Sequence, residues 1–356
     1  MKVFSTNLFF RLSTKDKMLF ARNLEVMVRS GMQILQSLEI LKKQSKSRAF
    51  VKILDQLIFD VKNGHFLAAG LERYKNVFGE FFINLIRVGE ASGTLSENLK
   101  YLSDELKKKE ELQKKIKGAM AYPMIIMFAT VGITSIMIFV IFPKILPVLT
   151  SINVELPLVT RIFIAASEFF IKYGYLVGLG VVGLIVGVVL LLRVPKVKFA
   201  WHKVLISIPV VGDMVRSINI ISFARTIGLL LRAGIKIVEA LEITANTLGN
   251  LVYKKEILRV ADGVKRGDPM SKYFMENTKL FPPIFSQMVV VGENTGKLDE
   301  SILFLADFYE SELDESTKTL SNFLEPIMLL VMGMIVAFVA LAIITPIYKI
   351  TQTLGG

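Results

Sequence analysis

The sequence predicts an all-α membrane protein with two homologous six-helix cytoplasmic bundles and three transmembrane helices. Three observations carry this prediction. Hydrophobic residues make up 53% of the 356 residues and charged residues only 21%, a balance shifted towards lipid relative to soluble chains. Three segments, each of about 20 residues or more, lack ionisable side chains. The chain also repeats itself at a constant offset along its length.

Composition excludes several classes of protein. The chain has no cysteine, which excludes disulfides, Fe–S clusters, cysteine nucleophiles and thiolate zinc sites. Its two histidines, His65 and His202, leave little for a histidine-based metal site, so we expect neither a metal nor a cofactor. The net charge of +12 suits nucleic acid, anionic lipid or a topology signal. Because no basic stretch is interleaved with aromatic residues, we do not expect nucleic-acid binding.

The uncharged segments set the membrane spans, because each is long enough for a helix to cross a hydrocarbon core of roughly 30 Å. The predicted spans are residues 118–143, 173–192 and 326–348. Lysines crowd the start of the first span and the end of the second, so the positive-inside rule places the N-terminus in the cytoplasm. The same rule gives an external loop at 144–172, a cytoplasmic linker at 193–217 and an external tail at 349–356.

A repeat with an offset of 203 residues explains this layout. Phe20-Ala21-Arg22 recurs as Phe223-Ala224-Arg225, and further identities follow to the end of the first span without a gap. Each repeat is a polar domain followed by one span. We therefore expect a first bundle at 13–117 and a second at 218–325, with the unpaired span 173–192 returning the chain to the cytoplasm.

The polar domains show helical signals in order. Ser13 and Asp16 form a capping-box-like start, and Gly31 can end the first helix in the left-handed conformation. Further helices are expected near 33–45, 48–63 and 79–91, and from Thr94 into the first span. In the second repeat, Asp268-Pro269 is a predicted N-cap and first-turn pair.

The duplicated motif Gly-Glu-x-x-Gly-x-Leu provides the main candidate interaction residues. The motif residues are Gly89, Glu90, Gly93 and Leu95 in the first copy and Gly292, Glu293, Gly296 and Leu298 in the second. The repeated arginines Arg22 and Arg225 are further candidates. The second copy differs from a phosphate loop, because the glycine spacing is one residue short and a leucine replaces the Ser or Thr that would hold magnesium. We expect the glycines to form a helix–turn–helix corner. The glutamates could be docking carboxylates or members of a core network.

Other features bear on the membrane and on partners. Tyr122, Pro123, Glu325 and Pro326 mark the predicted edges of the first and third spans. Trp201 lies in a basic interfacial stretch, a usual place for an aromatic anchor. Residues 15–122 carry a net charge of +7 and residues 218–325 carry −3, which suggests different partners, or pairing of unlike bundles between subunits, or simply solvated faces.

The pattern as a whole resembles the type II secretion F family, the inner-membrane platform proteins of type IV pilus and type II secretion machines. The resemblance covers residues 15–350 and rests on the doubled glycine–glutamate motif, Ala121-Tyr122-Pro123, Ile208-Pro209-Val210-Val211-Gly212 and Glu325-Pro326. It implies cytoplasmic six-helix bundles, homo-oligomers, and contact with a hexameric assembly ATPase, with pilin or pseudopilin helices and with other inner-membrane assembly proteins. It implies no catalysis by this chain.

We therefore expect a non-enzymatic inner-membrane platform that couples a cytoplasmic ATPase to pilin or pseudopilin polymerisation and contacts membrane lipid. The alternative is a small transporter or channel subunit. The absence of ionisable residues within the spans speaks against it, because coupled transport usually needs such a group at depth. A membrane-tethered enzyme is disfavoured, because no acid–base, nucleophile or metal-ligand set can be assembled.

Overall fold

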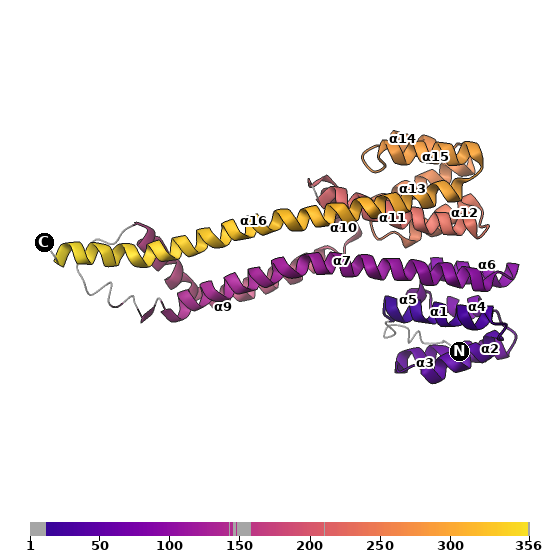
Figure 1. Cartoon of the computed structure of the whole chain (residues 1–356), viewed down its shortest axis with the longest axis horizontal. Helices are drawn as coiled ribbons and strands as arrows, with labels where there is room; N and C mark the ends of the chain where they lie inside the picture. Colours follow the sequence, from indigo (N-terminus) through magenta and orange to yellow (C-terminus); the bar gives the residue numbers. More distant parts are fainter. Residues whose placement is uncertain (1–11, 142, 145–146, 148–157, 210, 355–356) are drawn as a thin grey trace. The chain divides into compact units, whose positions relative to one another are not determined.

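The protein, seen here as a computed structural model, is described at residues 12–141, 143, 144, 147, 158–209 and 211–354, and this part contains helices but no strand (Figure 1). The chain divides into two compact units. One unit joins Met1–Lys115 with Phe199–Glu315 and contains both bundles; the other joins Ile116–Lys198 with Ser316–Gly356. The predicted all-α class is confirmed.

The first bundle begins and ends its helices where local sequence signals predicted. Ser13 caps the first helix in a capping box with Asp16, and Gly31 follows the helix with a φ of 81°. The last helix starts one residue after Thr94 and runs unbroken into the apolar sequence. The helices are α1 (Thr14–Arg29), α2 (Ile34–Gln44), α3 (Arg48–Lys62), α4 (Leu67–Glu72), the single turn α5 (Lys75–Phe78), α6 (Glu80–Ser92) and α7 (Leu95–Ile136).

The second bundle repeats this order. Its helices are α11 (Val211–Arg232), α12 (Ile237–Thr247), α13 (Leu251–Lys265), α14 (Met270–Glu276), α15 (Pro283–Thr295) and α16 (Leu298–Leu354). The predicted N-cap at Asp268 was wrong. Pro269 holds the N-cap position, and the carboxylate of Asp268 instead accepts hydrogen bonds from the Tyr273 hydroxyl at 2.6 Å and the Lys272 ammonium at 3.1 Å.

The repeat extends to the packing of the two cores. Each bundle is centred on three phenylalanines from equivalent positions, all nearly or fully buried: Phe20, Phe78 and Phe82 in the first, and Phe223, Phe281 and Phe285 in the second. In both triads the ring centroids of the first and third members lie about 6 Å apart, at 6.2 and 5.9 Å. Because these rings fill the centre of each core, the phenylalanines recur at the same positions of the two repeats.

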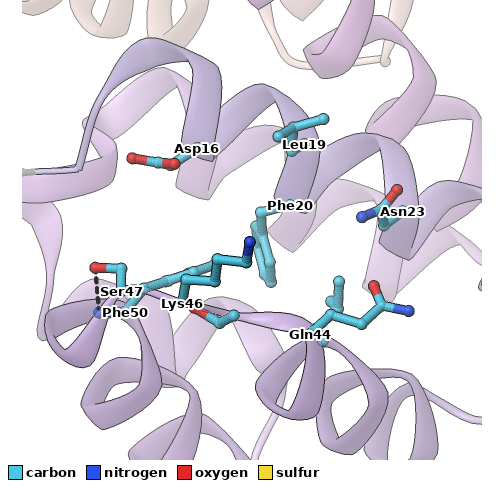
Figure 2. A pocket seen from close by; sticks show the side chains of 10 residues that line it. Asp16, Leu19, Phe20, Asn23, Gln44, Lys46, Ser47 and Phe50 are labelled. Carbon is cyan, nitrogen blue, oxygen red and sulfur yellow. Dashed lines mark hydrogen bonds between the residues drawn. The ribbon is translucent and has the colours of Figure 1, made fainter.

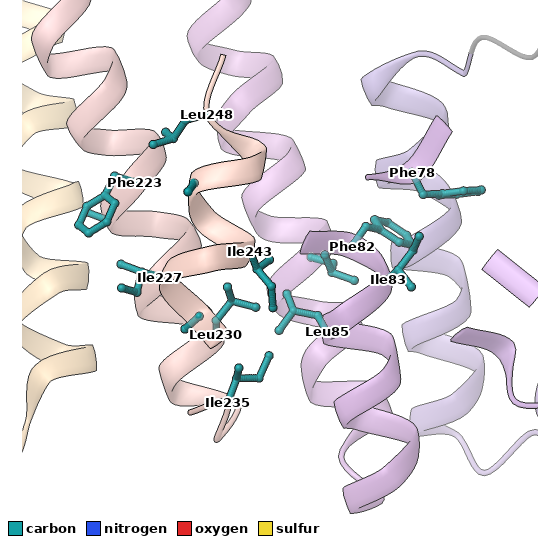
Figure 3. Close-up of a cluster of buried hydrophobic side chains, with 14 of the residues drawn as sticks. Phe78, Phe82, Ile83, Leu85, Phe223, Ile227, Leu230, Ile235, Ile243 and Leu248 are labelled. Atoms are coloured by element: carbon teal, nitrogen blue, oxygen red, sulfur yellow. The ribbon is translucent and has the colours of Figure 1, made fainter. Parts of the chain in front are cut away.

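The two cores meet within the first unit. Helix α6 of the first bundle packs against α11 and α12 of the second. Figure 3 shows Leu85 of α6 pointing towards Leu230 of α11 and Ile243 of α12. All three side chains are buried, at 0%, 0% and 7% exposure, so the hydrophobic core is continuous across the two bundles.

The segment predicted as a linker, 193–217, is largely helical. It contains α10 (Pro195–Ser207) and the first residues of α11. The Nδ1 atom of His202 on α10 accepts a hydrogen bond of 3.0 Å from the backbone amide of Leu251, the first residue of α13. The linker therefore contains a helix docked on the second bundle, a contact between positions 49 residues apart that spacing alone does not reveal.

The second unit contains the apolar halves of α7 and α16, the π-helical turn η2 (Met137–Ile141) and α9 (Leu158–Leu191). Helix α9 begins within the segment that we expected to be the external loop. Its Thr160 hydroxyl donates a 3.0 Å hydrogen bond to the carbonyl of Ala342, and Ser167 donates one of 3.3 Å to Ile138. Arg161, Glu168 and Lys172 lie in α9 before the charge-free run that begins at residue 173.

Within the part of the chain that the structure describes, three helices are long and apolar enough to cross a membrane: Met124–Ile141, Thr160–Leu191 and Val211–Arg232. The first two fall on predicted spans, and their most apolar windows are not buried within the protein. In the helix Val211–Arg232 the window is 67% buried, because this helix forms the core of the second bundle. The predicted third span lies in α16, whose described apolar stretch is Pro326–Ala342.

Candidate functional site

The glycines of the duplicated motif form a tight helix corner in each bundle. Helix α6 ends at Gly93, with a φ of 76°, and α15 ends at Gly296, with a φ of 70°. A Cβ on Gly89 would lie 2.8 Å from the Cα of Leu95, and one on Gly292 would lie 3.0 Å from the Cα of Leu298. A side chain at either preceding glycine would therefore collide with the next helix.

Each motif glutamate binds the N-terminus of a short helix that lies earlier in the same bundle. Glu90 accepts hydrogen bonds from the amides of Leu67 and Ala68, at 2.6 and 2.8 Å, in the first turn of α4. Burial raises the pKa of Glu90 above its usual value, although the two amide hydrogen bonds act in the opposite direction. A carboxylate placed at a helix N-terminus satisfies free amides and complements the helix dipole.

The second repeat copies this arrangement. Glu293 accepts a 2.6 Å hydrogen bond from the amide of Met270 and longer ones of 3.4 Å from that of Ser271, in the first turn of α14. Of the two interpretations that the sequence left open, the geometry favours the core-network carboxylate. A role of these motif residues in binding partners stays a prediction.

The two repeated arginines differ sharply. Arg22 is half exposed and lies 3.7 Å from its neighbour Glu25 on the same helix. Arg225 is only 8% exposed, and its guanidinium donates hydrogen bonds to Asp307 and to Glu310, the second at 2.6 Å. Equivalent positions in the repeat thus have different environments, and only the second forms a buried charge centre.

Arg225 belongs to a charged junction between the bundles. Its Nε lies 3.6 Å from Oε2 of Glu105, which comes from α7 of the first bundle. Lys108 of the same helix donates a 3.0 Å hydrogen bond to Asp307 of α16, and Lys115 pairs with Asp314 about two turns further on. Lysines of the basic bundle therefore meet acids of the acidic bundle within one chain.

Burial and pairing perturb the acids of this junction. Burial raises the pKa of Glu105, against the opposing effect of Arg225. Burial alone would also raise the pKa of Asp307, but the hydrogen bonds from Arg225 and Lys108 outweigh it and bring this pKa below its usual value. A cavity of about 460 Å³ lies beside these groups, lined by Tyr101, Asp104, Glu105, Lys108, Arg225, Leu229, Arg232, Glu300, Leu303, Phe304 and Asp307.

A second pocket, of about 560 Å³, opens on the first bundle (Figure 2). Asp16, Leu19 and Asn23 line it from α1, Gln44 lines it from the end of α2, and Lys46 lines it from the loop before α3. At the equivalent positions of the second bundle the side chains are mostly buried. There the residues 203 positions further on include Leu248, Asn250 and Tyr253, all buried, and His202 of α10 binds the start of α13.

The remaining predicted residues are placed as follows. Tyr122 and Pro123 lie inside α7, and Glu325 and Pro326 lie inside α16, so both helices continue past the predicted membrane edges. The side chains of Tyr122, Pro123 and Glu325 lie outside the part that the structure describes. Among the described residues, no group of three or more His, Asp or Glu side chains could hold a metal ion.

Sequence reasoning missed the junction around Arg225. Its other members, Glu105, Lys108, Asp307 and Glu310, are not among the candidate residues predicted from the sequence. Two signals pointed to them: the opposite charge of the bundles, and lysines at 107–109 where the second repeat has Glu310 and its acidic neighbours. Pairing of unlike bundles between subunits was one of the alternatives left open by the sequence, and the structure shows such pairing within one chain.

Comparison with known proteins decides the family. The family model for type II secretion system protein F matches the chain twice, at residues 20–143 and 223–346. The chain belongs to the type II secretion system protein F family. The two matches are offset by 203 residues and confirm the predicted repeat.

Relatives within the protein F family cover nearly the whole chain. The type IV pilus assembly protein PilC of Thermus thermophilus is 36% identical over 96% of this chain and 84% of its own length. The type II secretion system protein F of Pseudomonas aeruginosa is 31% identical over 97% of this chain and 85% of its own length. PilC of Myxococcus xanthus is 30% identical over 94% of this chain and 80% of its own length. Membership of this family does not favour a transporter or channel.

Proposed function

We propose that this chain is the inner-membrane platform of a type IV pilus or type II secretion machine and couples a cytoplasmic assembly ATPase to the polymerisation of pilin or pseudopilin. One observation carries the proposal. Helices α7 and α16 each start at the glycine–glutamate corner of a bundle and continue without interruption into apolar sequence. Such a helix links a surface that can bind a motor to a segment that can contact a membrane-embedded subunit. The names of the relatives refer to pilus assembly and type II secretion.

The first bundle is our proposed site for the hexameric ATPase. Two features support this choice. The bundle has a net charge of +7, which attracts an acidic partner. It also carries the open pocket lined by Asp16, Asn23 and Lys46, whereas Asn219 and Thr226, the equivalents of the first two in the second bundle, are buried.

The apolar helices are the proposed site for pilin or pseudopilin. A small apolar cavity of about 180 Å³ lies between α7 and α16 in the second unit. Its lining is aliphatic apart from two threonine hydroxyls: Thr130, Ile133, Thr134, Met137, Met332, Ile335, Val336 and Ala340. A lining of this kind suits the packing of another apolar helix, where small and hydroxyl side chains permit close approach. Other inner-membrane assembly proteins are further candidate partners.

A homo-oligomer is also part of the proposal. On α6, which packs against the second bundle, the apolar residues Phe81 and Val88 are half-buried and pack against the hydrophobic core. The equivalent residues of α15, Ile284 and Val291, are 41% and 47% exposed. We propose that a second copy covers them. Because the chain has no cysteine, an Ile284→Cys variant can be tested directly for disulfide-linked dimers, with the exposed Leu258→Cys as its control.

We further propose an inner-membrane location with the N-terminus in the cytoplasm and the C-terminus outside. The asymmetry of lysine and arginine around the spans supports this orientation. Single-cysteine variants at Ser45 and Gln352 test it, because a membrane-impermeant thiol reagent applied to intact cells should label only the second. Labelling of Ser45→Cys in intact cells would reverse the orientation.

The decisive experiment is site-specific crosslinking to the ATPase. Lys46 borders the open pocket, and Gly249 is the equivalent exposed position of the second bundle. A photo-crosslinker attached to Lys46→Cys should capture the ATPase, whereas the same reagent on Gly249→Cys should capture little. Crosslinking through Gly249→Cys alone would refute the assignment. We also propose that the chain is no enzyme, and ATP hydrolysis by the purified chain alone would contradict this.

A further inference from the structure

Helix α10 joins the apolar sequence to the second bundle. It begins at Pro195, and only residues 192–194 separate it from the end of α9 at Leu191. Three residues span at most about 10 Å. Because α9 is long and apolar enough to cross a membrane, the start of α10 is confined to the neighbourhood of the membrane surface by chain connectivity alone.

One face of α10 is attached to the second bundle. His202 accepts the hydrogen bond from the amide of Leu251, and the Nζ of Lys255 lies 5.9 Å from the centre of the Phe199 ring. Ile206 packs against the hydrophobic core. Residues 199, 202 and 206 are spaced by three and four positions, so they lie on one face of the helix.

The opposite face of α10 presents an apolar stripe. Val197, Trp201, Val204 and, just beyond the helix end, Ile208 follow a spacing of four, three and four residues. At about 100° per residue, this stripe lies roughly half a turn from the bundle-facing side. Its members are 38%, 45%, 52% and 38% exposed. Four large apolar side chains on one exposed face of a short helix are more than scattered surface hydrophobics.

Only positive charge accompanies the stripe. Lys196 and Lys203 lie along one side of it and Lys198 along the other. No acidic residue occurs between Glu168 and Asp213. A shallow depression continues the stripe at the end of the helix, lined by Ala200, Lys203, Val204, Ser207, Ile208 and Pro209.

We propose that α10 lies on the surface of an anionic lipid bilayer, with its apolar stripe among the headgroups and upper acyl chains and its lysines on lipid phosphates. An apolar face flanked by lysines and carrying a tryptophan is the arrangement of interfacial helices. A second copy of α10 is disfavoured as the occupant, because it would bring three more lysines against these three without an acid. The bundle-facing contacts of His202 and Phe199 would then hold the second bundle at the membrane.

The chain supplies its own probe, because Trp201 is its only tryptophan. The full-length protein is placed in nanodiscs of zwitterionic phosphatidylcholine alone or with about one-third anionic phosphatidylglycerol. We expect Trp201 emission to shift to shorter wavelength in the anionic discs. We also expect lipids brominated near the headgroup to quench it more than lipids brominated near the chain end. Emission typical of water in both discs would overturn the proposal.

Two sets of variants separate lipid binding from other causes. Lys196→Gln, Lys198→Gln and Lys203→Gln together should abolish the difference between the two discs. The matched control carries Lys43→Gln, Lys52→Gln and Lys100→Gln, which remove the same charge from exposed positions of the first bundle and should leave the difference intact. Equal loss in both sets would refute a local role for α10.

A single substitution in the apolar stripe separates lipid contact from loss of the fold. Val204→Ser keeps all the lysines and should reduce quenching by headgroup-brominated lipid at least twofold, with helicity by circular dichroism unchanged. Unchanged quenching would show that the stripe does not face lipid. Emission that depends on the number of protein copies per disc and ignores lipid charge would assign the stripe to a second copy, and would overturn the proposal as well.

Discussion

The two bundles have equivalent cores but differ in the charged residues at their surfaces and contacts. The phenylalanine triad, the glycine corner and the glutamate that caps a distant helix recur at equivalent positions with nearly the same geometry. Arg22 and Arg225, by contrast, are also equivalent, yet one is exposed and the other is the centre of a buried charge cluster. The comparison indicates that the retained residues maintain the fold, whereas the residues that diverged determine what each bundle contacts.

The largest expected effect tests the shared interior. Phe20→Ala and Phe223→Ala each empty the same place in a core, so each should lower the local free energy of unfolding by about 3–5 kcal/mol. Native-state hydrogen exchange, followed separately for peptides of each bundle, measures this loss. A loss confined to one of the two variants would show that the cores are not equivalent.

The next effect tests the differing edges. Arg225→Met leaves Glu105 and Glu310 partly buried without their cation, so we expect a loss of about 2–3 kcal/mol, reduced from a fully buried pair because Asp307 is largely exposed. Arg22→Met removes a half-exposed cation from buried Glu25, which keeps Arg29 at 3.2 Å as its ion-pair partner, so the loss should be less than about 1 kcal/mol. Thermal unfolding of the detergent-solubilised chain compares them. Equal losses would remove the distinction between the two positions.

A smaller effect tests the capping glutamates. Glu90→Ala and Glu293→Ala each leave two helix amides without their carboxylate acceptor, at an expected cost of about 1–3 kcal/mol. Exchange of the amides of Leu67 and Ala68, or of Met270 and Ser271, should accelerate first. If both variants retained wild-type protection at these amides, the proposed capping role would be wrong.

The smallest effect concerns pH. Because burial raises the pKa of Glu90 above 4.5, the folded chain keeps a proton over a window in which the unfolded chain has released it. Stability should therefore fall as the pH rises from about 4.5 through the raised value. Glu90→Gln should weaken this fall in melting temperature, and Glu97→Gln, at an exposed position, should not. A steeper fall in Glu90→Gln would reverse the sign of the prediction.

Local signals and the repeat predicted most of the fold. The capping box at Ser13, the left-handed Gly31 and Gly93, and the run of α7 into the apolar sequence depend on residues close together in the chain. The gap-free offset of 203 residues then extended each assignment to the second bundle. Features of this kind can be predicted because neighbouring residues determine them.

Features that depend on distant residues were missed or wrong. Asp268 was expected to cap α14, but Glu293 already serves the first amides of that helix from 23 residues away. The contact of α10 with α13 through His202 has no local signal. Helix α9 begins at Leu158, earlier than the charge-free run suggested. Arg161 and Glu168 are compatible with a helix, and the hydrogen bond from Thr160 to the carbonyl of Ala342 helps to hold its first turn.

The ion pairs from Lys108 and Lys115 to α16 join two bundles that one chain already tethers. Each exposed pair on its own stabilises by at most about 1 kcal/mol, which would be negligible between separate molecules. Because one chain carries both bundles, these pairs do not have to offset the loss of translational and rotational freedom that opposes association of separate molecules. The duplication therefore places both sides of this contact in one chain, where the ion pairs add to the buried contacts of Leu85, Leu230 and Ile243.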